Sequence, residues 1–79
     1  MDTKNVELLE VKTSSVINEI GYDKQLKYLF VQFKGGRTYQ YYEVPSIIFE
    51  KMKDIVAKGE SIGKYFSANV RKKYKSAKL

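Results

Sequence analysis

The 79-residue sequence predicts a single α+β domain of the order β-β-β-α-α, in which a three-stranded antiparallel meander is followed by two helices on one face. Three observations lead to this fold class. Two runs rich in aromatic and β-branched residues, within 26–45, flank a pair of glycines. A third run, 15–22, suits a strand with an imperfect buried face. Further along, apolar residues recur at spacings of three and four on both sides of Gly59, which is the helical period.

The central element is the hairpin around the glycine pair at 35–36. Glycine reaches the positive φ angles that tight hairpin turns require, so two glycines between strand-like runs are a strong hairpin signal. We expect a two-residue loop, which places Tyr39 and Tyr41 on the face opposite Val31 and Phe33. A three-residue loop would shift the register by one and bring both tyrosines into the core.

Segment 15–22 predicts the first strand of the meander, because two sets of residues alternate along it. Residues 1–10 mix charge with apolar side chains, and both a flexible arm and a short extra strand remain open. The domain is expected to span 11–75, with 76–79 as a tail. The alternating sets of the strand are Val16, Asn18, Ile20 and Tyr22 on one face and Ile17, Glu19 and Gly21 on the other.

The first helix is predicted to follow Pro45, which suits the first helical position because its missing N–H costs nothing there. Gly59 is expected to end this helix, and Ser61 to cap the second one. Each helix is expected to pack on the sheet through a stripe of apolar side chains, and Met52 and Ile55 are expected to anchor the first helix. The apolar stripes are Ile48, Phe49, Met52, Ile55 and Val56 for the first helix, and Ile62, Phe66, Val70, Tyr74 and Ala77 for the second, with Phe66 and Val70 as its anchors.

Composition excludes several classes of function. The chain has no cysteine and no histidine, so disulfides, thiolate metal sites and the usual zinc and copper sites are not expected. No pair of acids is spaced as a catalytic dyad, and no serine has a histidine partner, so we expect neither an enzyme nor a cofactor. No apolar run approaches the roughly 20 residues of a membrane span. We therefore expect a cytoplasmic monomer that binds no metal and no membrane.

The positive charge is concentrated in the last quarter of the chain. The net charge is +6, yet residues 1–57 hold eight basic and eight acidic residues, whereas 58–79 hold seven basic residues and only Glu60. Such an asymmetry is typical of a protein that binds a polyanion, although a basic tail can also serve solubility alone. On a continuous second helix, one basic ridge would form from Lys64, Arg71, Lys75 and Lys78, with Lys72 at its flank.

Tyr39 and Tyr41 are the most specific local feature. On an exposed sheet face they would lie near Tyr28 and Phe30 and offer a platform on which unpaired bases stack. Cross-strand packing of these rings, or burial in the other register, is the alternative. The resulting set of candidate nucleic-acid-binding residues is Tyr39, Tyr41, Lys64, Arg71, Lys72 and Lys75.

Five segments together resemble the KTSC domain, a small domain named for its occurrence at the C-terminus of some lysyl-tRNA synthetases and also found as stand-alone bacterial and phage proteins. The resemblance covers residues 11–74 and implies no established activity, but RNA binding has been suggested for the family. Asparagine often follows the Tyr-Phe pair in the family, whereas Ser67 stands here. The segments are VKTSSVINEIGYD, LFVQF, GG, TYQYYEVP and SIGKYFSANVRKKY. The matching residues are Ser14, Ser15, Gly21, Tyr22, Leu29, Val31, Phe33, Tyr39, Tyr41, Val44, Pro45, Ser61, Gly63, Tyr65, Phe66 and Tyr74.

The function expected from the sequence is that of a small non-catalytic module. It would bind RNA or single-stranded nucleic acid through the basic C-terminal helix and an aromatic sheet face. The alternative is a protein-interaction module, in a phage or regulatory complex, that uses the aromatic face or an unpaired strand edge.

Overall fold

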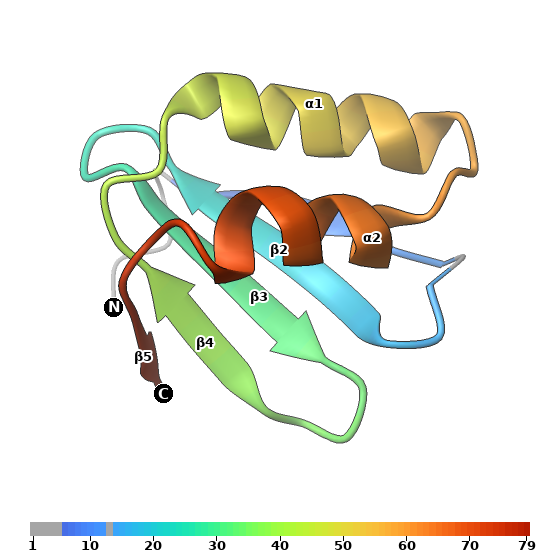
Figure 1. The fold of residues 1–79 in the computed structure, drawn as a ribbon, viewed down its shortest axis with the longest axis horizontal. Helices are drawn as coiled ribbons and strands as arrows, with labels where there is room; N and C mark the ends of the chain where they lie inside the picture. Colours follow the sequence, from blue (N-terminus) through green and yellow to red (C-terminus); the bar gives the residue numbers. More distant parts are fainter. Residues whose placement is uncertain (1–5, 13) are drawn as a thin grey trace.

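The computed structural model describes residues 6–12 and 14–79 and shows a two-layer α+β fold (Figure 1). Within these residues, an antiparallel sheet of five strands in the order β1-β2-β3-β4-β5 forms one layer and the helices form the other. The second helix, α2, continues directly into a π-helical turn, η1. The bounds are β1 Val6–Glu10, β2 Ile17–Asp23, β3 Tyr28–Phe33, β4 Thr38–Tyr41, α1 Ser46–Ala57, α2 Ile62–Phe66, η1 Ser67–Arg71 and β5 Ser76–Lys78.

The expected three-stranded meander is the middle of this larger sheet, so the predicted strand number was wrong. At one edge, β1 pairs with β2, which makes residues 6–10 a strand; residues 1–5 of the possible arm lie outside the described residues. At the other edge, β5 pairs with β4, and the N–H of Tyr42 donates to the carbonyl of Lys75 at 3.0 Å. The helical segment ends at Arg71, and residues 76–78 form the strand β5. This strand pairs with backbone groups that the edge of β4 would otherwise leave unpaired.

The strand β2 contains a bulge that the alternating pattern did not reveal. Its register with β3 shifts between Ile17 and Glu19, so Ile17 joins Ile20 in the core although three residues separate them. Val16 and Asn18, expected to share a face with Ile20 and Tyr22, are exposed, whereas Ile20 and Tyr22 are buried. The side-chain amide of Asn18 donates to Gln32 Oε1 at 3.1 Å across the strands.

The register of the central hairpin differs from the predicted one by one residue. Val31 pairs with Tyr39 and the N–H of Phe33 donates to the carbonyl of Arg37 at 2.7 Å, so the loop has three residues, 34–36. Both glycines of this loop have positive φ, at 102° and 92°. Tyr39 and Tyr41 therefore lie on the face that carries Val31 and Phe33, and Tyr41 is only 4% exposed. The predicted two-residue turn, and a platform of these two tyrosines on the exposed face, were wrong.

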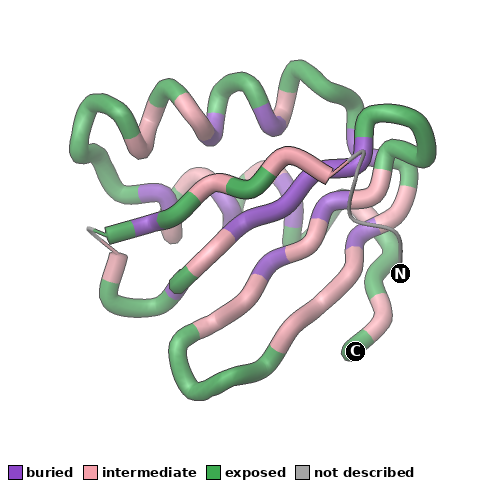
Figure 2. Tube along the Cα trace, turned by 180° about the vertical axis from the view of Figure 1, so that it is seen from behind, coloured by how far each residue is buried: buried purple, intermediate pink, exposed green. Residues whose placement is uncertain are grey.

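Both helices cover the same face of the sheet, as predicted. Tyr22, Leu29 and Tyr41 are paired across β2, β3 and β4 and therefore point to one side. Phe49 of α1 stacks on Tyr22 with ring centroids 5.1 Å apart, and Phe66 of α2 meets Tyr41 edge to face at 5.4 Å. The buried residues of the strands and helices lie between the two layers (Figure 2). The expected helix anchors Phe66, Val70 and Met52 are buried, and Ile55 packs against them half-buried.

The ends of α1 follow from single residues. Pro45 stands immediately before the first helical residue, one position earlier than predicted. At the other end, the N–H of Gly59 donates to Val56 and that of Glu60 donates to Ile55, at 3.1 and 3.0 Å. This pair of bonds is a Schellman motif, and it requires the left-handed conformation that Gly59 adopts with φ of 73°.

Among the described residues, no helix is both long and apolar enough to cross a bilayer.

We expect Gly59→Ala to lower the free energy of unfolding by about 1–2 kcal/mol, because a left-handed conformation is strained for a residue with a Cβ. No atom lies within 4 Å of the position that this Cβ would take, so the loss reports the backbone alone. Urea unfolding at 25 °C measures the change. Gly63→Ala is the matched control: Gly63 lies in α2 with equal space around it, so alanine there should leave stability unchanged or raise it by up to about 1 kcal/mol. Equal effects of the two changes would contradict this account.

Candidate functional site

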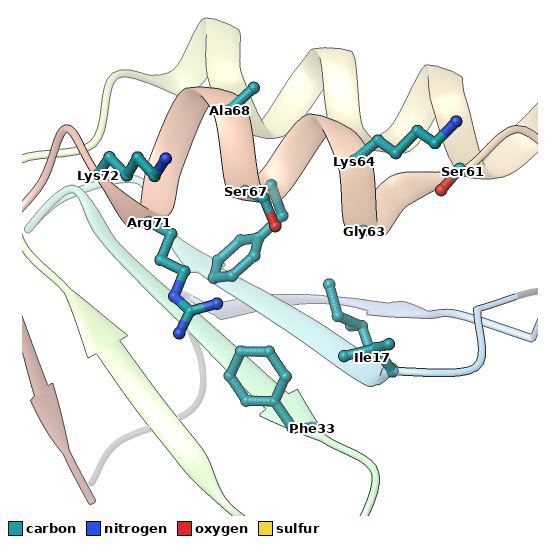
Figure 3. A pocket seen from close by; sticks show the side chains of 11 residues that line it. Ile17, Phe33, Ser61, Gly63, Lys64, Ser67, Ala68, Arg71 and Lys72 are labelled. Carbon is teal, nitrogen blue, oxygen red and sulfur yellow. The ribbon is translucent and has the colours of Figure 1, made fainter.

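Two adjoining pockets form a groove on the helix side of the sheet, between α2 with η1 and the hairpin of β3 and β4. The helix pocket has a volume of about 590 Å³, and the hairpin pocket about 550 Å³. Val16, Phe33 and Arg71 line both of them, so the pockets are neighbours along one groove. The helix pocket is otherwise lined by Ile17, Ser61, Gly63, Lys64, Phe66, Ser67, Ala68 and Lys72 (Figure 3), and the hairpin pocket by Ser15, Lys34, Arg37, Tyr39, Tyr41 and Ser76.

Every charged side chain that lines the groove is a cation. The groove cations are Lys34, Arg37, Lys64, Arg71 and Lys72. Among the residues that the structure describes, the ion pairs join Lys24, Lys53 and Lys58 to Glu7, Glu50 and Asp54, and none includes a groove cation. The positive charge of the groove is therefore not neutralised by contacts there, and it attracts anionic ligands.

Aromatic rings form the floor of this groove. Phe33 meets Tyr39 and Phe66 edge to face, with centroids 5.7 and 5.6 Å apart, and Phe66 meets Tyr41 in the same way. Phe66 and Tyr41 are buried, whereas Phe33 and Tyr39 are half-buried and keep part of their rings accessible. An accessible ring next to cations is the combination by which proteins hold unpaired bases and their phosphates.

The π-helical turn η1 brings Arg71 to the middle of the groove. A π-helix forms i→i+5 hydrogen bonds and therefore rotates less per residue than an α-helix. Since Val70 is fully buried against the sheet, the smaller rotation leaves Arg71 nearer to the sheet than an α-helix would. Arg71 extends from η1 toward Phe33 (Figure 3). Burial raises the pKa of Tyr41, and the nearby Arg71 acts in the opposite direction.

Five of the six predicted site residues line the groove. Tyr39, Tyr41 and Arg71 meet in the hairpin pocket, while Lys64 and Lys72 join Arg71 in the helix pocket. Lys75 lines neither pocket and lies between η1 and β5. The predicted basic ridge was wrong, because the helical segment ends at Arg71 and Lys78 belongs to β5.

Sequence reasoning missed three contributors to the groove: Phe33, Lys34 and Arg37. Phe33 was assigned to the core, Lys34 lies in a loop whose length was misjudged, and Arg37 follows that loop directly. The three-residue loop was the signal that could have found them, since it places the side chains of Arg37 and Tyr39 on the helix side together.

Among the residues of the family-like motifs, Ser14 and Tyr22 hold the fold and line neither pocket, whereas Ser61 lines the helix pocket. The hydroxyl of Ser14 accepts hydrogen bonds from the N–H groups of Val16 and Ile17, both at 3.0 Å. The buried hydroxyl of Tyr22 donates to the carbonyl of Val44. Ser61 occupies the N-cap position of α2, as predicted, but its side chain makes no cap hydrogen bond.

The opposite face of the sheet has no helix over it and carries a different chemistry. Tyr28 contacts Phe30 and Tyr42 edge to face at 6.4 and 5.5 Å, and Leu8 is 63% exposed beside a shallow hollow of about 180 Å³. Glu10 pairs with Glu19 across β1 and β2, which places two acids opposite each other. This open face is thus aromatic and partly acidic, and the cations gather on the helix side.

Comparisons with known proteins agree with this fold. The sequence profile of the KTSC domain family matches residues 13–74. A protein of Tsukamurella paurometabola is 38% identical over 66 residues, which cover 84% of this chain and 92% of that protein. The crystal structure of a KTSC domain protein from Yersinia pestis is similar with a TM-score of 0.71 and 32% identity, over 94% of this chain and 97% of that one.

Proposed function

The chain belongs to the KTSC domain family, and we propose that it is a non-catalytic module that binds RNA or single-stranded nucleic acid in the groove. One observation carries the proposal: five cations and the accessible rings of Phe33 and Tyr39 line the same groove, and no acidic side chain lines it. Cations bind the phosphates of a nucleic acid whatever its base sequence. An aromatic ring can stack only on a base that is not already stacked in a duplex. The combination therefore supports a single strand as the ligand.

The first test is the salt dependence of binding to a fluorescently labelled mixed-sequence RNA. Neutralising phosphates releases counterions, with a slope of about −0.7 per contact for single strands. With roughly four contacts, the affinity should fall about 50-fold between 50 and 200 mM salt. Lys64→Ala should lower the magnitude of the slope by about 0.7. Tyr39→Ala should weaken binding by about 1–3 kcal/mol and leave the slope unchanged, because stacking releases no counterions.

Lys51→Ala supplies the control for net charge, since Lys51 is an exposed cation on α1 that lines neither pocket. It should change affinity and slope much less than Lys64→Ala. Failure of the wild-type protein to bind RNA or single-stranded DNA at low salt would disprove the proposal.

A protein-interaction module is the second candidate, and the open face favours it. Leu8 is largely exposed there and lines the shallow hollow together with Phe30, whose ring contacts that of Tyr28, and the edge strand β1 is short. Binding through such an apolar surface would depend little on salt. Absence of nucleic-acid binding would therefore leave this candidate standing.

A further inference from the structure

Two pockets of similar size meet at one arginine, and this arrangement limits what the groove can hold. Their volumes, about 590 and 550 Å³, both fall in the range of roughly 300–1,000 Å³ that is typical of sites for small organic ligands. Each is large enough for one nucleotide. Arg71 is the only cation shared by their linings, while Lys64 and Lys72 belong to one pocket and Lys34 and Arg37 to the other.

We propose that the groove is a two-nucleotide site in which each pocket takes one base and Arg71 holds the phosphodiester that joins them. This inference rests on the proposed function and specifies its ligand. Arginine suits the central position because its planar guanidinium can form two parallel hydrogen bonds to one phosphate. Phe33, which lines both pockets beneath Arg71, provides the stacking surface shared by the two sites.

The remaining cations continue the path of the strand beyond the two nucleotides. Lys64 and Lys72 line the helix pocket, and Lys34 and Arg37 line the hairpin pocket. Phosphates on either side of the central one would meet these cations. Affinity should therefore rise steeply from one nucleotide to two, and then more slowly with each further phosphate.

The test compares adenosine 5′-monophosphate with the dinucleotide ApA, by amide chemical-shift titration of the full chain at low salt. The monophosphate carries about two negative charges and ApA carries one, so an unstructured cationic surface would prefer the monophosphate. A two-nucleotide site predicts the opposite order, with ApA binding about tenfold more tightly. An ApA analogue with an uncharged methylphosphonate linkage should lose this advantage.

Arg71→Ala should reduce the affinity for ApA about tenfold, to the level of the monophosphate. Lys73→Ala is the matched control: Lys73 lies two residues away, is exposed and lines neither pocket, so it removes the same charge without touching the site. Arg71→Lys keeps the charge but not the planar fork and should lose part of the affinity. If Arg71→Ala does not fold, Arg71→Lys and the methylphosphonate analogue still decide the question.

A mixed-sequence RNA octamer separates failure of this inference from failure of the proposed function. If the octamer binds with the expected salt dependence, but ApA binds no better than the monophosphate or Arg71→Ala equals Lys73→Ala, the two-nucleotide site is wrong and the proposed function stands. If the octamer does not bind, the proposed function is wrong and this inference falls with it.

Discussion

Phe66→Ala is expected to lower the free energy of unfolding by about 3–5 kcal/mol. Phe66 is 3% exposed, and its ring contacts those of Phe33 and Tyr41 from the helix side, so it anchors α2 and η1 to the hairpin. The change deletes these contacts and leaves a cavity that the short helix cannot close. Because small domains are typically stable by only about 5–15 kcal/mol, the variant should approach unfolding at 25 °C. Urea unfolding followed by circular dichroism measures the loss.

Two variants control for this result. Phe66→Leu keeps most of the buried volume and should lose much less stability than the alanine variant. Ser67→Ala changes the next residue along the chain, which is exposed, and should alter stability by no more than about 0.5 kcal/mol. An unfolding midpoint of Phe66→Ala close to that of the wild type would show that α2 is not docked on these rings.

The elements that sequence reasoning predicted correctly depend on local chemistry. The glycine pair specifies a hairpin, Pro45 marks the entry to α1, and Gly59 ends that helix through its positive φ. In each case the residue restricts or frees its own backbone, so the effect does not depend on distant parts of the chain.

The errors concern choices that local chemistry leaves open. Two glycines with positive φ suit a two-residue or a three-residue loop, and only the packing of the whole face selects between them. The helical spacing of Ile62, Phe66 and Val70 was correctly identified, but its continuation to Ala77 was a coincidence of spacing. That segment becomes β5 because the edge of β4 is available to it, which is a contact between distant residues.

The residues of the candidate site come together on a different face of the sheet from the one predicted. The observed register differs from the predicted one by one residue, so Tyr39 and Tyr41 lie on the helix side of the sheet, with Arg71, and not on the open face. Charge concentration in residues 58–79 pointed to three of the five groove cations, Lys64, Arg71 and Lys72, but only the structure shows that Arg37 of the hairpin lines the same groove. Sequence can count charges, whereas their convergence depends on how the two layers pack.

Stability should fall at alkaline pH because buried tyrosines stay neutral in the folded chain. Burial raises the pKa of Tyr22, and the neighbouring charges of Asp23 and Tyr74 raise it further. Burial raises the pKa of Tyr41 as well. In the unfolded chain a tyrosine ionises near pH 10, so above that pH the unfolded state releases protons that the folded state retains. The stabilisation is complete below about pH 10 and is lost as pH rises toward the folded pKa, by up to about 1.4 kcal/mol per pH unit for each tyrosine.

Tyr22→Phe tests this linkage because the stability that the variant loses should depend on pH. At pH 8 the variant should be less stable than the wild type by about 1–3 kcal/mol, since the buried carbonyl of Val44 loses its donor. Above pH 10 the variant has one fewer tyrosine to ionise on unfolding, so its stability should decline less steeply and the gap to the wild type should narrow. Urea unfolding of both proteins at intervals from pH 8 to pH 11.5 measures the two curves. Parallel curves throughout would show that Tyr22 ionises equally in the folded and unfolded chains and would refute the proposed linkage.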